Sequence, residues 1–284
     1  MLSILEMGGD YMVYELNPSQ FNTIAHLLEG KRINLEIRAV VEGFNPGWVF
    51  VDNVMTPSTA MVWSNGIKGF YFLGDVNSQD FNDSLDTYIK YIIAPRIRKM
   101  SLSSFEFSGT SPKWDKKLAQ IFKGRSLEIS KQFVYKLADK PLPKTVENDF
   151  NESYSIKEVN SRLLNDDSVN TDLVKESVLE WWGTLKNFNK NGMGYCIVHD
   201  KEAVCSCVAS SYDGREVQSH IVTKEDYRKK GLATMAVVEF VKESKNRDLN
   251  LYWDCMEKNL GSIALAEKIG YKKDYEYTLY EFPI

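Results

Sequence analysis

The hydrophobic pattern of this chain repeats. Each half shows a helix, three adjacent strands, and then a helix, a strand, a helix and a strand. The adjacent strands are predicted at 47–53, 59–65 and 68–75 in the first half and at 194–200, 203–211 and 216–223 in the second. Strands joined by short turns pair antiparallel, whereas parallel pairs need a helical crossover. This order of elements predicts an α/β fold of the mixed α+β kind, with a mostly antiparallel sheet. The same fold is expected in each half of the chain.

One segment between the halves interrupts this pattern. Residues 139–153, DKPLPKTVENDFNES, contain two prolines, several acidic residues and few apolar ones. Such a composition is typical of a linker. The sequence therefore predicts an N-terminal domain at 1–138, a linker at 139–153 and a C-terminal domain at 154–284.

Composition limits the classes of partner. A net charge of −4 provides no overall attraction for nucleic acid or an anionic membrane, so any anion site must be local. The four cysteines lack C-x-x-C spacing and the three histidines are scattered, which favours reduced thiols and no metal site. We see neither a signal-peptide pattern nor an apolar run long enough for a membrane span. A cytoplasmic protein is expected.

A basic loop in the second half leads directly into an apolar helix, in the segment DYRKKGLATMAVVEF at 226–240. The first N–H groups of a helix lack intrahelical partners and lie at the positive end of the helix dipole. Gly231 lets an anion approach the backbone, and Ala233 keeps the next exposed position small. Three basic residues add positive charge: Arg228, Lys229 and Lys230. This combination predicts a site for a pyrophosphate.

The residues TKEDYRKKGLAT resemble the acetyl-CoA signature of the GNAT N-acetyltransferase superfamily, R/Q-x-x-G-x-G/A. Farther along, YWDCMEKNLGSIALAEKIGY resembles the next strand and helix of that family, with Asn259 and Ser262 matching N-x-x-[SA]. This resemblance covers about residues 153 to 284. The phrases WWGTLKNFNKNGMGYC and WDC resemble a bacterial two-domain subgroup that includes zwittermicin-resistance-type acetyltransferases. That similarity extends over the whole chain and implies a degenerate GNAT-like N-terminal half.

The resemblance implies that the fourth and fifth strands of a GNAT fold separate and that the thioester of acetyl-CoA lies in the gap. Matched position by position, it assigns backbone contacts with the pantetheine arm to Ile221, Val222 and Thr223, and the start of the pyrophosphate motif to Arg228. The amides that would hold the pyrophosphate belong to Lys229, Lys230, Gly231, Leu232, Ala233 and Thr234. Asn259 and Ser262 would face the pantetheine and thiol end.

The resemblance is incomplete where the departing thiolate needs a proton. Many family members read LYEKLGF, with a tyrosine as the proton donor, whereas this chain reads LAEKIGY, with Ala266 at that position. Cys255, Ser262, Tyr271 or water remain as alternative proton sources.

Two residues of the strand at 216–223 are candidates for the general base, Glu216 and His220. In an unbroken strand they share a face, and a bulge would change this. Trp181 and Trp182 either line an acceptor pocket or pack between the halves.

The first half has GDVNSQDF where the repeat would require the phosphate loop, with a glycine but no Arg-x-x-Gly and with added acidic residues. We predict that this half binds no coenzyme and shapes the acceptor site or a homodimer surface. The expected function is acetyl-CoA-dependent N-acetylation of a primary amine of a small molecule. One alternative is a Fem-type aminoacyl-tRNA-dependent transferase, which would need a basic tRNA surface and no coenzyme loop. The other is a non-catalytic acyl-CoA-binding or regulatory module, favoured by Ala266.

Overall fold

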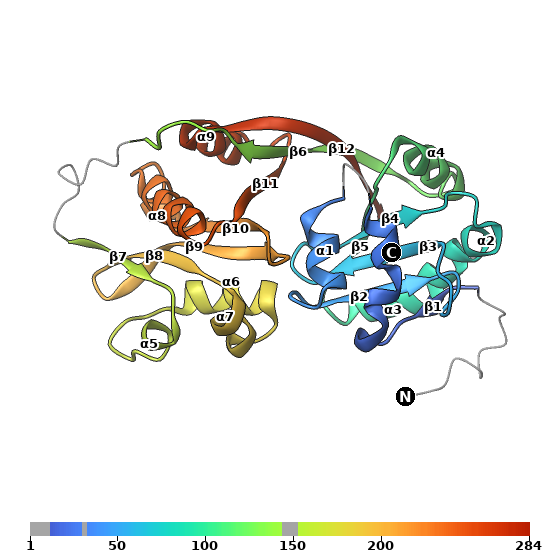
Figure 1. Ribbon diagram of the computed structural model, residues 1–284, viewed down its shortest axis with the longest axis horizontal. Coiled ribbons are helices and arrows are strands. Elements are labelled where there is room, and N and C mark those ends of the chain that lie inside the picture. Colours follow the sequence, from blue (N-terminus) through green and yellow to red (C-terminus); the bar gives the residue numbers. More distant parts are fainter. Residues whose placement is uncertain (1–11, 30–32, 144–152) are drawn as a thin grey trace.

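A computed structural model describes residues 12–29, 33–143 and 153–284, which form one sheet of twelve strands (Figure 1). Its strand order is β1-β2-β3-β4-β5-β12-β6-β11-β10-β9-β8-β7. The strands are β1 Tyr14–Glu15, β2 Gly47–Val51, β3 Thr59–Ser64, β4 Gly69–Gly74, β5 Ser104–Gly109, β6 Glu128–Leu137, β7 Tyr154–Glu158, β8 Gly194–His199, β9 Glu202–Tyr212, β10 Glu216–Thr223, β11 Asn250–Met256 and β12 Tyr271–Pro283.

The helices lie on both faces of this sheet (Figure 1). The α-helices are α1 Leu35–Val41, α2 Gln79–Tyr88, α3 Ala94–Arg98, α4 Pro112–Ile121, α5 Ser161–Leu164, α6 Asp172–Trp182, α7 Leu185–Asn191, α8 Leu232–Asn246 and α9 Leu260–Ile269. The 3₁₀ helix η2 spans Pro18–Leu28, the π-helical turn η3 spans Ile89–Ile93, and a short 3₁₀ turn, η5, spans Glu225–Tyr227.

The predicted fold class is confirmed. β7 to β10 form an antiparallel meander, and β2, β3 and β4 form another. Each meander is followed by a helix and one parallel strand pair, β4 with β5 in the first half and β10 with β11 in the second. The same succession of elements therefore occurs twice, as the sequence pattern indicates.

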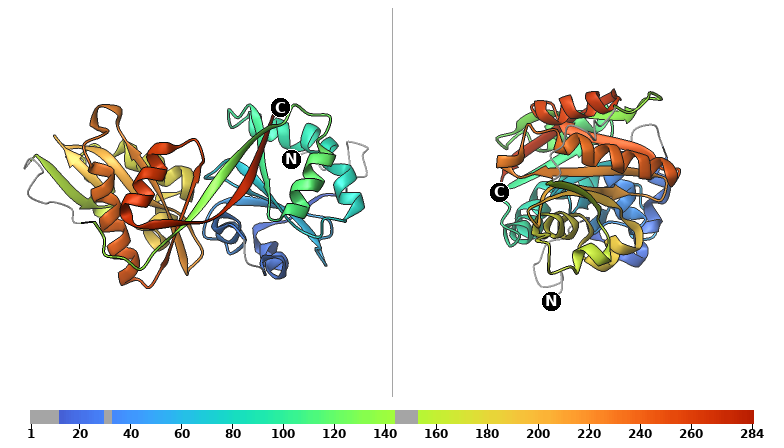
Figure 2. Two further views of the ribbon diagram at one scale, coloured as in Figure 1. Left: turned by 90° about the horizontal axis from the view of Figure 1, so that it is seen from above. Right: turned by 90° about the vertical axis from the view of Figure 1, so that its left-hand side faces the viewer.

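Two long strands join the halves. β6 is the last strand of the first half but pairs with β11 of the second half on one side and with β12 on the other. β12 in turn ends against β5 of the first half. Figure 2 shows these two strands running side by side between the halves. Each half therefore depends on a strand contributed by the other for the continuity of its sheet.

The structure contains elements that the sequence pattern did not predict. The short helices α1, α5 and α7 are additional. The apolar pattern at 79–100 predicts one long helix, which in the structure is divided into α2, η3 and α3. Pro95 explains the division because it has no N–H to donate, and a π turn precedes it. Most of the predicted linker, residues 144–152, lies outside the described residues. No helix of the described ranges has the length and apolar character required to cross a bilayer.

Polar side chains of the first half fasten it to β9, β10 and α6. The buried Asn45, in the loop after α1, donates to the carbonyl oxygens of Trp181 at 2.9 Å and Ser210 at 2.8 Å and accepts from the N–H of Tyr212 at 3.2 Å. Arg38 of α1 forms ion pairs with Asp213 at 2.6 Å and with Glu216. The position of α1 is thereby fixed relative to the second half.

We expect Asn45→Ala to destabilise the protein, because three backbone groups that Asn45 pairs across the halves lose their partner. A loss of about 2 kcal/mol in the free energy of unfolding is expected. Urea unfolding followed by tryptophan fluorescence measures it. The matched control is the exposed Asn165→Ala, which should change this free energy by less than about 0.5 kcal/mol. Equal unfolding midpoints for wild type and Asn45→Ala would contradict the role given to this contact.

Candidate functional site

The parallel pair β10–β11 separates partway along its length. Its paired residues are Glu216 with Asn250, Val217 with Leu251 and Gln218 with Tyr252, and β10 then continues to Thr223 without further pairing to β11. A bulge between Val217 and Ser219 lies at the same point. The two strands therefore form a fork whose vertex is the Gln218–Tyr252 pair.

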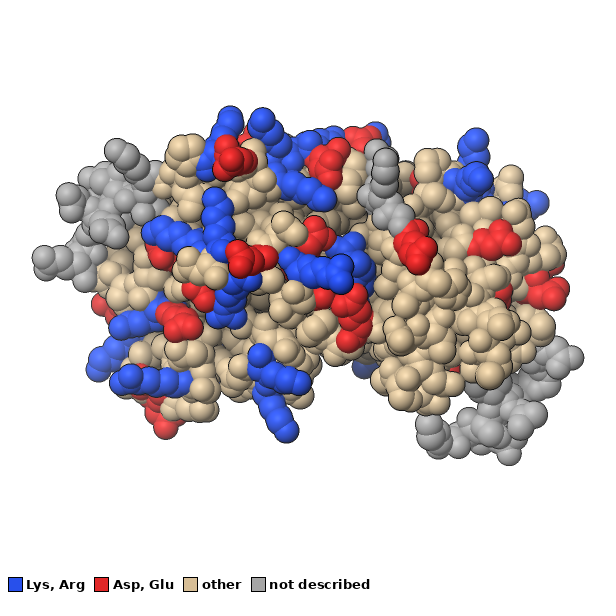
Figure 3. All heavy atoms as spheres, viewed as in Figure 1, with Lys and Arg blue, Asp and Glu red and all other residues tan. Residues whose placement is uncertain are grey.

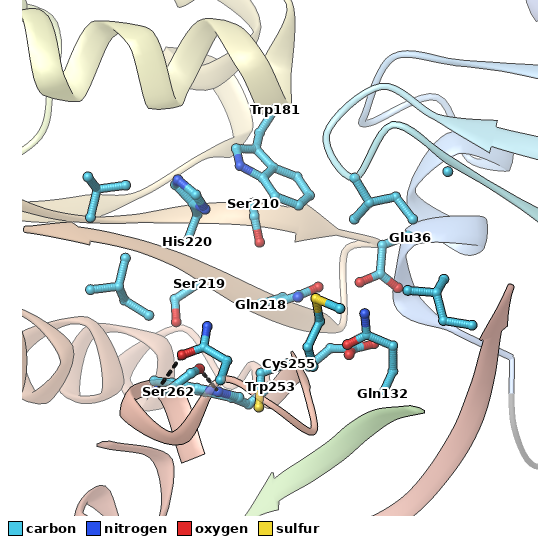
Figure 4. Close-up of a pocket in the computed structure, with 18 of the residues that line it drawn as sticks. Glu36, Gln132, Trp181, Ser210, Gln218, Ser219, His220, Trp253, Cys255 and Ser262 are labelled. Atoms are coloured by element: carbon cyan, nitrogen blue, oxygen red, sulfur yellow. Dashed lines mark hydrogen bonds between the residues drawn. The ribbon is translucent and has the colours of Figure 1, made fainter. Parts of the chain in front are cut away.

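A cavity of about 820 Å³ lies at this fork and extends to the first half of the chain (Figure 4). From the second half it is lined by the free end of β10, from Gln218 to Thr223, by Arg228 and by β11 and the start of α9. From the first half it is lined by α1, β4 and β5, while β6 and β12 supply side chains between the two. Residues far apart in the sequence thus line one cavity.

The basic loop stands at one end of the cavity. Lys229 has φ 60° and Gly231 has φ 80°, so the backbone turns sharply at both residues before α8 begins. Gly231 is the N-cap residue of α8, and no side chain of this residue caps the first amides of the helix. Nε of Arg228 donates to the carbonyl oxygen of Thr223 at 3.3 Å, which ties the loop to the end of β10. Because the first amides of an α-helix have no intrahelical acceptor, this end is suited to an anion. Figure 3 shows Lys and Arg side chains gathered mostly over the second half.

The start of α9 forms a second wall. Oδ1 of Asn259 accepts from the N–H of Ser262 at 3.1 Å and so caps the helix. The hydroxyl of Ser262 accepts from Nε1 of Trp253 at 3.0 Å (Figure 4). Cys255 also lines the cavity, and burial raises the pKa of its thiol, so it is a neutral group at neutral pH. These side chains are held in place by one another.

His220 and Trp181 form the opposite wall. Their ring centroids are 5.6 Å apart, and both rings line the cavity. Burial lowers the pKa of His220 below its ordinary value, which favours the neutral imidazole. Trp181 also packs against the first half, since a Cβ on Gly66 would stand 2.0 Å from its ring. This tryptophan therefore lines the cavity and packs between the halves.

The end of the cavity nearest the first half is acidic. Glu36 of α1 is 1% exposed, and burial raises the pKa of its carboxyl to about 7. Burial and the nearby Glu36 raise the pKa of Asp254, whose Oδ2 accepts from the hydroxyl of Tyr277 at 2.7 Å. Burial and the facing Glu281 raise the pKa of Glu106 on β5 to about 7. Three carboxyl groups in one poorly hydrated space favour a cationic ligand.

Several polar atoms of the cavity wall are buried without a hydrogen-bond partner among the described residues. They are Oε2 of Glu36, Oγ of Ser108, Nε1 of Trp181, Oγ of Ser210, Oε1 of Gln218 and Oγ of Ser219. Buried polar groups are normally paired, because leaving one unpaired costs about 1–3 kcal/mol. Their common location indicates a surface built for a polar ligand.

The structure brings most of the proposed coenzyme residues together. Ile221, Val222 and Thr223 lie on the free end of β10, Arg228 and Ala233 reach the cavity from the loop and α8, and Asn259 and Ser262 reach it from α9. The remaining loop positions, Lys229, Lys230, Gly231, Leu232 and Thr234, continue the same backbone into the first turn of α8.

Two catalytic candidates lie elsewhere. Glu216 is not among the residues that line the cavity, and its carboxylate is paired with Arg38. Tyr271 is 3% exposed and belongs to the core, where burial raises the pKa of its hydroxyl. Ala266 is likewise fully buried in that core.

Sequence reasoning missed Glu36, Glu106 and Asp254. For Glu36 a signal was present, since NLEIRAVV places a carboxylate within an apolar run.

The first half has no comparable fork. β4 pairs with β5 from Gly69 to Phe72, and Trp114 of α4 donates its indole N–H to the carbonyl oxygen of Gly74 at 3.1 Å. Trp114 is the third residue of α4, as Ser262 is of α9. A large buried ring therefore stands where the second half has a small side chain at the cavity.

Among the described residues, His, Cys, Asp and Glu side chains do not form a cluster of three or more suited to a metal ion.

A family model for GNAT acetyltransferases matches residues 25–280, and the chain belongs to this family. An uncharacterized N-acetyltransferase of Bacillus subtilis (strain 168), YdfB, is 24% identical over 270 residues, which are 95% of this chain and 98% of that protein.

Solved structures share the fold. A GCN5-related N-acetyltransferase-like protein from Streptococcus suis 89/1591 has a TM-score of 0.64 and 21% identity, over 93% of this chain and 98% of that one. A tandem GNAT protein from the clavulanic acid biosynthesis pathway has a TM-score of 0.59 and 11% identity, over 95% of this chain and 98% of that one. The repeated succession of elements is thus a tandem GNAT fold.

The raised pKa of Glu36 predicts a pH-dependent stability. The folded protein keeps a proton on Glu36 up to about pH 7, whereas the unfolded carboxyl ionises near 4.5, so this stabilisation is present below 4.5 and is lost as the pH rises to 7. Glu36→Gln remains neutral at every pH. The variant should be more stable than wild type at pH 8, by on the order of 2 kcal/mol, and equally stable at pH 4.

Urea unfolding at the two pH values measures this difference. The exposed Glu176→Gln on α6 is the matched control and should show no pH-dependent difference from wild type. A Glu36→Gln variant that is less stable than wild type at pH 8 would refute the prediction.

Proposed function

We propose that the chain transfers the acetyl group of acetyl-CoA to a primary amine of a small molecule. One observation carries the proposal: a single cavity connects the fork of β10 and β11, beside the basic loop, with a wall of carboxyl groups on the first half. An anionic donor and a cationic acceptor would thus meet from opposite ends. Membership of the GNAT acetyltransferase family supports the acyl transfer itself.

The donor end fits acetyl-CoA. The pyrophosphate would accept from the amides of residues 229–234, with Arg228 beside it. The pantetheine arm would pair with the free edge of β10 at residues 221–223, since β11 no longer occupies that edge. Asn259 and Ser262 would contact the pantetheine and thiol end. Acetyl-CoA supplies the activated acetyl group, and the chain holds its carbonyl at the vertex of the fork.

The acceptor end fits an amine. Glu36, Glu106 and Asp254 attract an ammonium group, and the unpaired polar atoms of Ser108 and Ser210 offer it further hydrogen bonds. The volume of about 820 Å³ must also hold the end of the pantetheine arm, which limits the acceptor to a small molecule. Positioning the amine against the thioester supplies much of the rate enhancement in this kind of reaction.

We also propose the division into an N-terminal domain at 1–138, a linker at 139–153 and a coenzyme-binding domain at 154–284, with one coenzyme for each chain. The continuous β4–β5 ladder and the position of Trp114 support the absence of a second coenzyme site. The N-terminal domain contributes Glu36 and Glu106 to the acceptor end instead.

Arg228→Glu should weaken acetyl-CoA binding by about tenfold or more, because it places a negative charge beside the pyrophosphate. Isothermal titration calorimetry measures the dissociation constant and the stoichiometry, which should be one. The control Arg215→Glu makes the same change of charge in the exposed β9–β10 turn and should keep the dissociation constant within about twofold. No measurable binding of acetyl-CoA by wild type would refute the donor.

The acceptor is tested with a panel of primary amines: putrescine, spermidine, glucosamine, tyramine and lysine methyl ester. Release of the CoA thiol is followed with a thiol reagent, and mass spectrometry identifies the acetylated amine. Acetyl-CoA binding without amine-dependent release of CoA would instead favour the acyl-CoA-binding module.

A further inference from the structure

We infer that Glu36, contributed by the N-terminal half, is the general base that takes the proton from the acceptor ammonium at the vertex of the β10–β11 fork. The inference rests on the proposed function and adds the identity of the group that activates the amine. It also makes the N-terminal half a part of the catalytic site.

The packing of α1 places Glu36 at the fork. Its neighbour Leu35 is fully buried against Val134 of β6 and Tyr252 of β11, and Tyr252 belongs to the last paired position of the fork. The side chain of Gln218, the partner of Tyr252 in that position, also lines the cavity, and its amide favours the charged form of the Glu36 carboxyl. Figure 4 shows Glu36 and Gln218 facing each other across the cavity. The carboxyl is thus held beside the vertex of the fork.

The other oxygen is available to a ligand. Oε2 of Glu36 is buried, lines the cavity and has no hydrogen-bond partner among the described residues. Arg38, two residues along α1, is committed to Asp213 and Glu216 and does not pair with Glu36 among the described ion pairs. A carboxylate with an unpaired oxygen that faces the cavity is arranged to accept a proton from a neighbouring ammonium.

The other acidic and basic groups near the fork are less suited to this step. The carboxylate of Glu216 is neutralised by Arg38 outside the cavity. Oδ2 of Asp254 already accepts from the hydroxyl of Tyr277 and is therefore not available to a ligand. His220 lies on the Trp181 side of the cavity, and Glu106 lies on β5 in the sheet of the first half.

The groups around Glu36 set the pKa of its carboxyl near neutral pH, which suits a general base that works at this pH. Burial raises it, and the Glu36 backbone, the charge of Arg38 and the Gln218 amide lower it in part, which leaves a pKa of about 7. The remaining polar groups that face Glu36 are Tyr71 from β4, Tyr252 and Asp254 from β11, and Tyr275 and Tyr277 from β12. Burial raises the pKa of each of the four tyrosines, so they stay neutral, while burial and the nearby Glu36 raise the pKa of Asp254.

The proton balance needs no additional acid. One proton of the R-NH₃⁺ group moves to Oε2 of Glu36, and the neutral nitrogen attacks the thioester carbonyl carbon. A C–N bond forms and the C–S bond breaks. The nitrogen releases a second proton, which leaves with the sulfur as the CoA thiol, and Glu36 then returns its own proton to solvent. This balance is consistent with Ala266 at the position where many family members have a tyrosine.

The test uses Glu36→Gln in the full chain with acetyl-CoA and the amine of the panel that wild type acetylates fastest. The dissociation constant of acetyl-CoA should stay within about twofold, whereas kcat should fall about 100-fold or more. Wild-type kcat should rise through pH 7 and then level off, and the variant should lose this rise. Glu36→Asp, which shortens the carboxylate, should restore part of kcat and the pH-dependent rise. Glu42→Gln, at the exposed C-terminal end of the same helix, is the matched control and should keep wild-type kcat.

Two results separate the possible failures. If wild type acetylates an amine and Glu36→Gln keeps its kcat and pH profile, the inference fails while the proposed function stands. A loss confined to His220→Gln in the same assay would assign the base to His220 and would also overturn the inference. If wild type acetylates none of the amines, both the proposed function and the role of Glu36 are refuted for this acceptor class.

Discussion

The pairing of β6 with β12 is the constraint on which the rest of the structure depends. β6 supplies the neighbour that β11 would otherwise lack, and β12 supplies the neighbour of β5. Without this exchange each half would expose a long strand edge, which is prone to unwanted pairing. Because the two strands also pair with each other over most of their length, the sheets of the two halves become one surface. The cavity lies where this surface passes from one half to the other.

This continuity explains why the two ends of the cavity differ in charge. The basic loop and the free amides of α8 belong to the second half, whereas Glu36 and Glu106 belong to the first. The net charge of −4 does not explain why one end of the cavity is basic and the other acidic. The difference arises because α1 is held over the fork by Arg38 and Asn45, whose partners lie in the second half. The difference in charge between the two ends of the cavity is therefore a property of the interface between the halves.

The parts of the fold that sequence predicted well are those set by local chemistry. β10 occupies the predicted residues 216–223, and Gly270 ends α9 with φ 110°, because turn residues and a glycine C-cap act over short distances. α1 was missed because its seven residues are nearly all buried and therefore lack the alternation of polar and apolar faces. The bulge at Val217–Ser219 and the pairing of Glu216 with Arg38 depend on distant segments. The position of the basic loop before α8 could thus be read from sequence, whereas the acidic end of the cavity could not.

Repetition of a fold does not require repetition of its site. The two parallel pairs are equivalent by order, yet β4 and β5 stay paired to Phe72 and Gly109, while β10 and β11 separate after Gln218 and Tyr252. In the first half the buried Trp114, at the third position of α4, donates its indole N–H to the carbonyl oxygen of Gly74 at the end of β4. In the second half a serine at the third position of α9 leaves the space open to the cavity. In the first half the two strands stay paired, so no fork opens between them. The side chains of Glu106 and Ser108 on β5 instead line the cavity at the open fork of the second half. The cavity at the open fork of one half is therefore completed by a wall that the other half supplies.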